Sequence, residues 1–170
     1  ISFGVAPRIN ASGRMGHEEE ALNLFLANNL ESALEITKEL NDYNTLRQST
    51  EKNIYEEVVQ KIEKNNLDEN DSIVVGGNNW HHGVIGIVSS KVTDKYYKPS
   101  ILLSFEDDIA KGSGRSVPGF DLYEGLTKCE DLLEKYGGHS MAVGLTLKKE
   151  NLEKFKERFE QIAKEKNIKE

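Results

Sequence analysis

The chain has 170 residues, and 29 acidic against 22 basic side chains give it a formal net charge of −7. This length suits one domain, or one domain with an appendage, and 37% hydrophobic residues suffice to bury an ordinary core. The acidic balance argues against a general basic coat for nucleic acid, although a local basic groove remains compatible with it. The sequence contains no apolar run long enough to span a bilayer, so we expect no membrane association.

Cys129 is the single cysteine, which rules out an intrachain disulfide and fits a reducing cytoplasm. With only four histidines beside it, a zinc site built from Cys and His is not expected. The first residue is isoleucine, and the opening residues resemble the interior of a longer chain. We therefore expect a fragment of a larger protein.

The first 71 residues are expected to form a loop and a helical connector. Residues 1–16 contain three glycines and a proline and show no periodicity, which predicts a loop. Residues 17–28 have three glutamates directly after His17, as suits a helix N-terminus. From Leu30 to about Asn65 there is no Gly or Pro, and apolar residues recur at helical spacing. Residues 17–71 hold 14 acidic and 5 basic side chains, so we expect this long helix to be a solvated connector.

Residues 72–170 alternate between strand and helix patterns. Short apolar or alternating runs predict strands at 72–76, 100–105, 110–117 and 143–147. Helical spacing predicts helices at 83–97, 121–136 and 149–166, the second opening on a capping box of Asp121 and Glu124 and ending at Gly137-Gly138-His139. This order predicts an α/β domain with a mixed, partly parallel sheet flanked by helices.

Familiar catalytic motifs are missing from the sequence. There is no phosphate-binding P-loop and no GxSxG nucleophile motif, and Gly112 and Gly114 do not extend to a dinucleotide fingerprint because residue 117 is valine. The acidic residues outside the helices have no metal-ligand spacing. The sequence therefore predicts neither a catalytic centre nor a metal site.

Four segments combine glycine and small residues with cationic or imidazole side chains. They are Pro7–Gly16, Gly76–Gly86, Lys111–Gly119 and Gly137–Gly144. Glycine lets the backbone approach a ligand and expose N–H groups to phosphate oxygens, and arginine adds a two-pronged donor for phosphate. Together the four segments indicate a phosphate-rich ligand.

Each segment also has a plain structural interpretation. Glycine-rich segments are often only turns, and Arg115 could pair with Asp107 or Asp108. His139 could cap the preceding helix, and Trp80 could pack in the core rather than stack on a base. Cys129 is expected on the inner face of a helix, in the core.

The motifs taken together resemble one family. APRINASGRM (6–15), LNDYNTLRQ (40–48), WHHGVIGIVSSKV (80–92), KGSGRSVPGFDL (111–122) and GGHSMAVGLTL (137–147) stand in the order expected of the RecJ exonucleases. These are single-stranded-DNA-specific 5′→3′ exonucleases of the DHH phosphoesterase superfamily. The resemblance implies that residues 1–71 are the connector to a catalytic DHH domain outside this sequence, and that residues 72–170 are a DHHA1 domain.

The resemblance also implies roles for individual residues. Mn²⁺ or Mg²⁺ would be bound by the DHH domain of the parent enzyme, with no metal in this fragment. The residues expected to contact the single strand are Arg8, Asn10, Arg14, His81, Ser113, Arg115, Ser116, Gly137, Gly138 and His139, and His139 is also expected to face the phosphate and assist catalysis. Partners would be single-stranded DNA, the DHH domain, and a single-strand-binding protein or a helicase, in repair and recombination of DNA. The fragment alone is expected to be inactive.

Two other functions stay open from the sequence. The parent could be a DHH–DHHA1 phosphodiesterase acting on short oligonucleotides or cyclic dinucleotides. The chain could also be a non-catalytic module whose long acidic helix docks a partner protein.

Overall fold

The computed structural model describes residues 3–166. The chain divides into two compact units, Ile1–Asn53 and Ile54–Glu170, and the division falls inside one long helix. Each unit is described by itself. The domain boundary expected after residue 71 stays a prediction, whereas the division into compact units comes earlier in the chain.

The first unit is helical. It contains α1 (Ala6–Arg14), α2 (Glu18–Leu26) and the first part of α3 (Leu30–Lys64). Three glutamates in the first turn of α2 complement the positive end of the helix. The long uninterrupted α3 confirms the helix expected from about residue 30 to residue 65.

The prediction of a loop over residues 1–16 is wrong, because α1 occupies most of that segment. Pro7 lies in the first turn of α1, where its fixed φ fits a helix and its missing N–H costs nothing. Ala11 and Ser12 are buried. The glycines that suggested a loop are placed where a helix tolerates them: Gly13 is in the last turn, and Gly16 follows the helix with φ +83°.

The second unit is built on a five-stranded sheet with the order β1-β2-β3-β5-β4. The strands are β1 (Ile73–Asn78), β2 (Ser100–Glu106), β3 (Ile109–Arg115), β4 (Lys135–His139) and β5 (Ala142–Lys148). β1 and β2 are parallel, and the other three neighbouring pairs are antiparallel. The mixed, partly parallel sheet flanked by helices is therefore confirmed.

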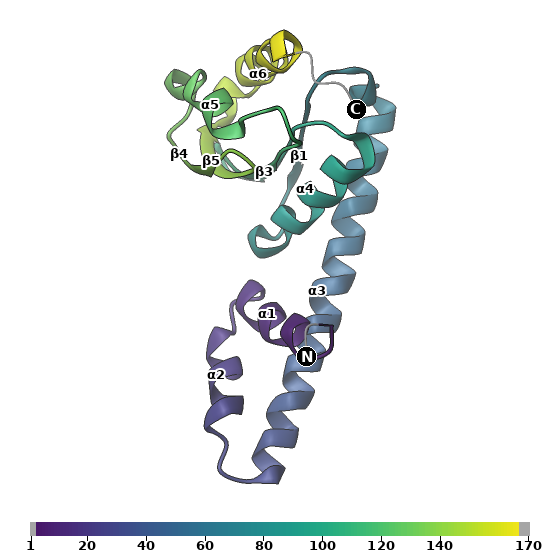
Figure 1. Ribbon diagram of the computed structural model, residues 1–170, viewed down its shortest axis with the longest axis vertical. Coiled ribbons are helices and arrows are strands. Elements are labelled where there is room, and N and C mark those ends of the chain that lie inside the picture. Colours follow the sequence, from purple (N-terminus) through teal and green to yellow (C-terminus); the bar gives the residue numbers. More distant parts are fainter. Residues whose placement is uncertain (1–2, 167–170) are drawn as a thin grey trace. The chain divides into compact units, whose positions relative to one another are not determined.

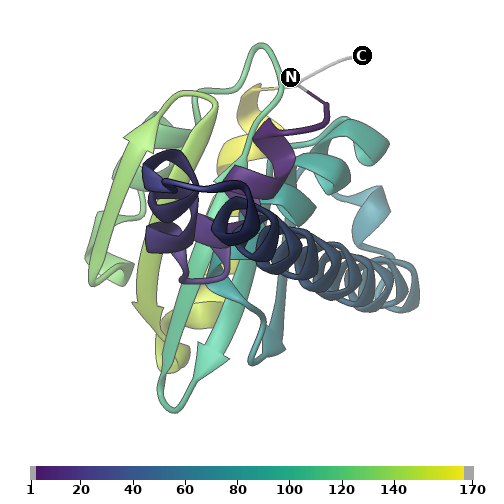
Figure 2. The same cartoon turned by 90° about the horizontal axis from the view of Figure 1, so that it is seen from below.

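The helices of this unit cover the sheet unequally. α5 (Leu122–Thr127) and α6 (Leu152–Lys166) pack on one face, and α4 (His82–Tyr96) packs on β2 and β3 from the other face (Figure 1). Short 3-10 turns lie at Leu67–Glu69, Glu130–Leu132 and Lys149–Asn151. Figure 2 shows the β4–β5 hairpin in light green at the end of the sheet away from α4.

The main core lies between the sheet and the α5–α6 layer. Phe155 and Phe159 of α6 are fully buried there, together with Leu122 and Leu126 of α5. Cys129 is buried in the same cluster, and burial raises the pKa of its thiol to about 11, so the thiol is an inert core group. Cys129 lies just after α5 rather than on a continuing helix.

The prediction of a helix over residues 121–136 is correct only for its start. Asp121 accepts a hydrogen bond from the Glu124 N–H, as the capping pattern predicts. The helix then ends at Thr127, and residues 135–139 pair with β5 as strand β4. Gly137, Gly138 and His139 therefore belong to a strand and do not cap a helix, which excludes that interpretation of His139.

Candidate nucleic-acid interface

The alternation along β3 assigns its side chains to two faces of the sheet. Gly112 and Gly114 face the main core, where a Cβ would come within 2.5 Å of Leu103 and 2.9 Å of Val143. These two positions admit only glycine because the neighbouring side chains fill the space. Successive side chains in a strand point to opposite faces, so Lys111, Ser113 and Arg115 lie on the other face.

The register of β5 and β4 extends this second face into three rows. Lys111 pairs with Thr146 and Thr146 with Lys135; Ser113 pairs with Gly144 and Gly144 with Gly137; Arg115 pairs with Ala142 and Ala142 with His139. We call the surface made by these nine residues the open face. One end is cationic with Lys111 and Lys135, the middle row has Ser113 beside the two glycines, and the other end holds Arg115 and His139.

Arg115 is held against α4. Its Nη1 donates to Ser113 Oγ at 3.0 Å and to the Gly114 carbonyl at 2.7 Å. A Cβ on Gly86 of α4 would lie 2.9 Å from Arg115 Nη2 and 3.1 Å from Ser113 Oγ. Glycine at this position therefore leaves the space that the guanidinium occupies. The backbone carbonyl of Arg115 accepts from Thr93 of the same helix. α4 therefore forms a wall beside the open face that positions Arg115.

Pairing of Arg115 with Asp107 or Asp108 is excluded by the strand geometry. Both aspartates lie between β2 and β3, at the opposite end of β3 from Arg115. Seven strand residues at about 3.3 Å each separate Asp108 from Arg115 by roughly 20 Å. That distance is beyond the reach of an arginine side chain.

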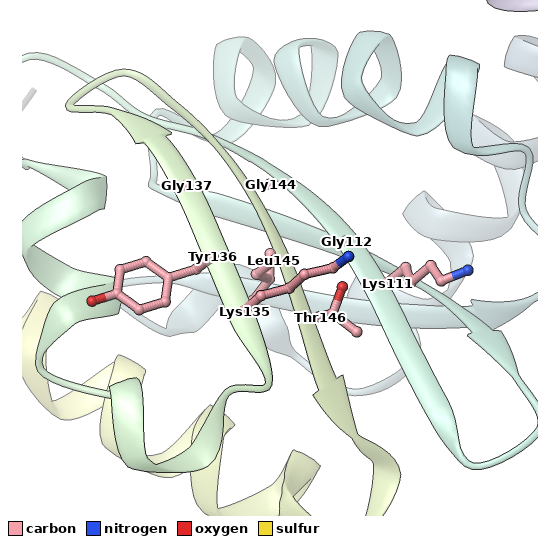
Figure 3. Close-up of a pocket in the computed structure, with 8 residues that line it drawn as sticks. All are labelled: Lys111, Gly112, Lys135, Tyr136, Gly137, Gly144, Leu145 and Thr146. Atoms are coloured by element: carbon pink, nitrogen blue, oxygen red, sulfur yellow. The ribbon is translucent and has the colours of Figure 1, made fainter.

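A groove of about 390 Å³ lies at the Lys135 end of the open face (Figure 3). The Lys135 side chain extends across β5 towards β3, and Lys111 extends away from the groove. Tyr136 points away as well, and its ring lies 5.6 Å from that of Tyr123. The groove is lined by Lys111, Gly112, Lys135, Tyr136, Gly137, Gly144, Leu145 and Thr146.

Lys111 forms an ion pair with the carboxylate of Glu106, which lies outside the groove. Its Nζ lies 2.8 Å from Glu106 Oε2, and His82 of α4 contacts the other oxygen of the same carboxylate. The hydrogen bond from Lys111, followed by that from His82, lowers the pKa of Glu106 from 4.5 to about 2. Glu106 is therefore ionised at neutral pH and holds Lys111 at the margin of the open face.

The other expected contact residues of the second unit take different places. His81 caps α4, where its Nδ1 accepts from the Gly83 N–H at 3.1 Å. Ser116 is buried, and its hydroxyl donates to the Phe120 carbonyl at 2.8 Å. Gly138 has φ +138°, and a Cβ there would lie 2.2 Å from the Ala142 carbonyl oxygen. These residues shape the loops around the open face, while Ser113, Arg115, Gly137 and His139 lie on it.

The three candidates of the first unit lie on α1 and do not share one side of it. Arg8 donates from Nε to Asn41 of α3 and from Nη1 to the Gly4 carbonyl. Asn10 and Arg14 are exposed and four residues apart, which places them on one helix face. Arg8 is half-buried and is rotated away from that face by the helical period.

Trp80 is a packing residue. It is 4% exposed, its Nε1 donates to Glu57 at 2.9 Å, and Lys61 stands 5.2 Å from its ring centroid. Burial raises the pKa of Glu57, but the hydrogen bonds from Trp80 and Lys61 lower it below its usual value overall. Lys61 also donates to the Gly76 carbonyl, so this cluster joins α3 to β1 within the second unit.

The part of the chain that the structure describes contains no cluster of side chains that could bind a metal ion. No group of three or more His, Cys, Asp or Glu side chains in residues 3–166 could hold an ion. Within the same residues, no helix is long and apolar enough to cross a membrane. Within residues 3–166, the open face therefore holds no cluster of metal ligands.

Sequence reasoning missed the groove and the Glu106 cluster. The helix expected over residues 121–136 includes Lys135, whereas in the structure Lys135 lies on β4 beside Thr146 of β5. The alternation of Lys111, Ser113 and Arg115 was visible in the sequence, and a period of two was enough to place the three on one face.

A family model described as the DHHA1 domain matches residues 70–165. The chain belongs to the DHHA1 domain family. Single-stranded-DNA-specific exonuclease RecJ of Bacillus subtilis (strain 168) is 39% identical over 165 residues, which cover 96% of this chain and 21% of the relative. The resemblance to the RecJ exonucleases is thereby confirmed for nearly the whole chain.

Solved structures agree with this family. RecJ of Thermus thermophilus in complex with Mg²⁺ matches with a TM-score of 0.87 at 34% identity, covering 96% of this chain and 25% of that one. The same protein in complex with Mn²⁺ matches with a TM-score of 0.86 at 33% identity, covering 96% and 24%. This DHHA1 chain thus spans about a fifth to a quarter of the length of these RecJ relatives.

Proposed function

We propose that this DHHA1 chain is the strand-gripping part of a single-strand-specific 5′→3′ DNA exonuclease that acts in DNA repair and recombination in the cytoplasm. The open face carries the proposal, because it sets Ser113, Arg115 and His139 beside glycine backbone on three adjacent strands. RecJ relatives over 96% of the chain support the substrate class.

The chemistry of hydrolysis would come from the parent enzyme. RecJ of Thermus thermophilus is known with Mg²⁺ and with Mn²⁺, and a divalent ion activates water for attack on a phosphodiester when bound. Residues 3–166 hold no cluster that fits such an ion, so we place its ligands in a DHH domain outside this chain. On this proposal the chain alone binds DNA without cleaving it.

The residues of this chain would bind and orient the strand. The Arg115 guanidinium is presented by Ser113 and α4 and would donate to a phosphate, with His139 in the same row on the far side of β5. His139 Nδ1 accepts from the Met141 N–H at 3.3 Å, which leaves the Nε2 side for a phosphate. If the protein contacts only the sugar–phosphate backbone of the DNA, binding would not depend on the base sequence.

The resemblance to the RecJ exonucleases adds further residues and a partner protein to the proposal. Asn10 and Arg14 of α1 offer an exposed polar face that could take part in strand binding in the parent enzyme. A single-strand-binding protein or a helicase would be a partner of that enzyme. His81, Ser116 and Gly138 would act by shaping the loops and strands that present the contact residues.

The proposal is tested by amide-shift mapping of this chain with a 5′-phosphorylated single strand at low salt. We expect shifts at Ser113, Arg115, Gly137 and His139, and none on α6. Arg115→Ala should weaken binding, so that these shifts need a higher strand concentration, whereas Arg158→Ala on α6, on the opposite side of the sheet, should leave them unchanged. Mn²⁺ should produce no cleavage.

Several outcomes would contradict the proposal. Equal shifts with duplex DNA would remove the single-strand preference. Shifts with cyclic dinucleotides but not with the strand would favour the phosphodiesterase alternative, and no shifts with any nucleic acid would favour a protein-docking module.

A further inference from the structure

The groove contains the ammonium group of Lys135, which pairs with no other group among the described residues. Lys135 is exposed, and its side-chain Nζ has neither an ion-pair nor a hydrogen-bond partner among residues 3–166. Two other lysines of the sheet differ: Lys111 of the open face is bound to Glu106 at 2.8 Å, and Lys148 at the end of β5 lies 3.9 Å from Glu134. Lys135 is therefore the cation of this groove that is ready to meet an anion.

The groove is shaped for a phosphate group rather than for a base. A Cβ on Gly137 would meet nothing within 4 Å, and one on Gly144 would meet only the Gly112 carbonyl at 3.9 Å, so a ligand can approach the backbone of both. The hydroxyl of Thr146 adds a donor beside Lys135 (Figure 3). Tyr136, the aromatic residue of the lining, is turned towards Thr127 and Glu130 and does not offer its ring to a base.

The distance between the two ends of the open face fixes how a strand could occupy both. Lys135 and His139 are four residues apart on β4, and Thr146 and Ala142 are four residues apart on β5. At about 3.3 Å per strand residue, the two rows are roughly 13 Å apart. One sugar unit joins consecutive phosphates and is too short for that span, so the two rows would hold phosphates that are not neighbours.

We propose that Lys135 and Thr146 form a second phosphate subsite, which binds a strand at least two nucleotides away from the phosphate held at the Arg115–His139 row. The proposal rests on the proposed function and deepens it. With this second subsite, the open face binds longer strands more tightly than dinucleotides, because a dinucleotide with a 5′-phosphate cannot occupy both rows.

The test compares two probes on the 170-residue chain, a 5′-phosphorylated thymidine dinucleotide and the corresponding hexanucleotide. Affinities are measured by NMR titration at several salt concentrations. Losing one phosphate contact to a single strand lowers the salt dependence, d log K/d log[salt], by about 0.7, and at ~50 mM salt lowers affinity about eightfold. We expect both changes in Lys135→Ala for the hexanucleotide and neither for the dinucleotide.

The controls separate this proposal from the proposed function. Lys154→Ala removes another exposed lysine, on α6 across the sheet, and should change neither affinity. Arg115→Ala should weaken both probes. Lys135→Gln keeps a polar side chain of three carbons but removes the positive charge, so it should reproduce Lys135→Ala, and the amide spectra report whether each variant is folded.

Three results would overturn the second subsite. Equal losses for both probes in Lys135→Ala would place the terminal phosphate itself in the groove. Unchanged affinity for both, with Arg115→Ala still harmful, would remove the groove from the binding site and leave the proposed function standing. Wild-type chain that binds neither probe would refute the proposed function and the subsite together.

Discussion

Gly86→Ala tests how the fold positions Arg115 without altering Arg115 itself. The new Cβ would lie 2.9 Å from Arg115 Nη2 and 3.1 Å from Ser113 Oγ. Ordinary contact begins at 3.4 Å, so the guanidinium must move by about 0.5 Å. Since the atom met is the far end of a flexible side chain, we expect the clash to be relieved there and not in the backbone of α4.

The free energy of folding should change little. Alanine is favoured over glycine inside a helix by about 1 kcal/mol, and this gain offsets the cost of displacing the guanidinium. For a chain of this size 1 kcal/mol shifts Tm by about 2–4 °C. The change in Tm should therefore stay within about 4 °C.

Binding should suffer more than folding. A hydrogen bond to a charged group is worth about 1.5–3 kcal/mol, so a displaced Arg115 should lower affinity for a 5′-phosphorylated strand roughly tenfold or more. Thermal unfolding by circular dichroism and NMR titration measure the two effects. Ser90→Ala, one turn along α4, is the control and should leave binding intact. Full affinity in Gly86→Ala would refute the assignment of Arg115, and a Tm loss of 10 °C would show Arg115 to be rigidly packed.

Two further predictions concern single residues of the second unit. Gly138→Ala should destabilise the chain by about 3 kcal/mol, because φ +138° disfavours a side chain and the Cβ would lie 2.2 Å from the Ala142 carbonyl oxygen; an unchanged Tm would contradict this. The carboxyl of Glu106 should titrate near pH 2 in carbon-detected NMR, so that its contact with Lys111 is complete above about pH 4.5 and is lost as pH falls towards 2. Lys111→Ala should move this midpoint towards 4.5, and a midpoint already near 4.5 in the wild type would show that the contact is not formed.

Local patterns were sufficient where an element depends on its own residues. The long run without Gly or Pro predicted α3, and the alternation in residues 110–117 predicted the strand β3. The capping interaction of Asp121 also follows from neighbours in the sequence.

Local patterns failed where distant contacts decide. Residues 135–139 form β4 because they pair with β5, and no local feature shows that partner. The groove at Lys135 depends on the same pairing and could not be foreseen. In residues 1–16 the glycine content indicates a loop, whereas in the structure Pro7 and Gly13 lie at the two ends of α1, where a helix accepts them.

The glycines of the sheet divide into two classes, and the division supports the assignment of the open face. Glycine within a strand costs about 0.5–1 kcal/mol relative to alanine. At Gly112 and Gly114 packing explains the residue, since a Cβ would collide with Leu103 and Val143. At Gly137 and Gly144 nothing closer than 3.9 Å would meet a Cβ, and neither has a positive φ. Packing and backbone conformation therefore give no reason for these two glycines, whereas the proposed binding of a strand would, because it needs a phosphate backbone to approach the open face closely.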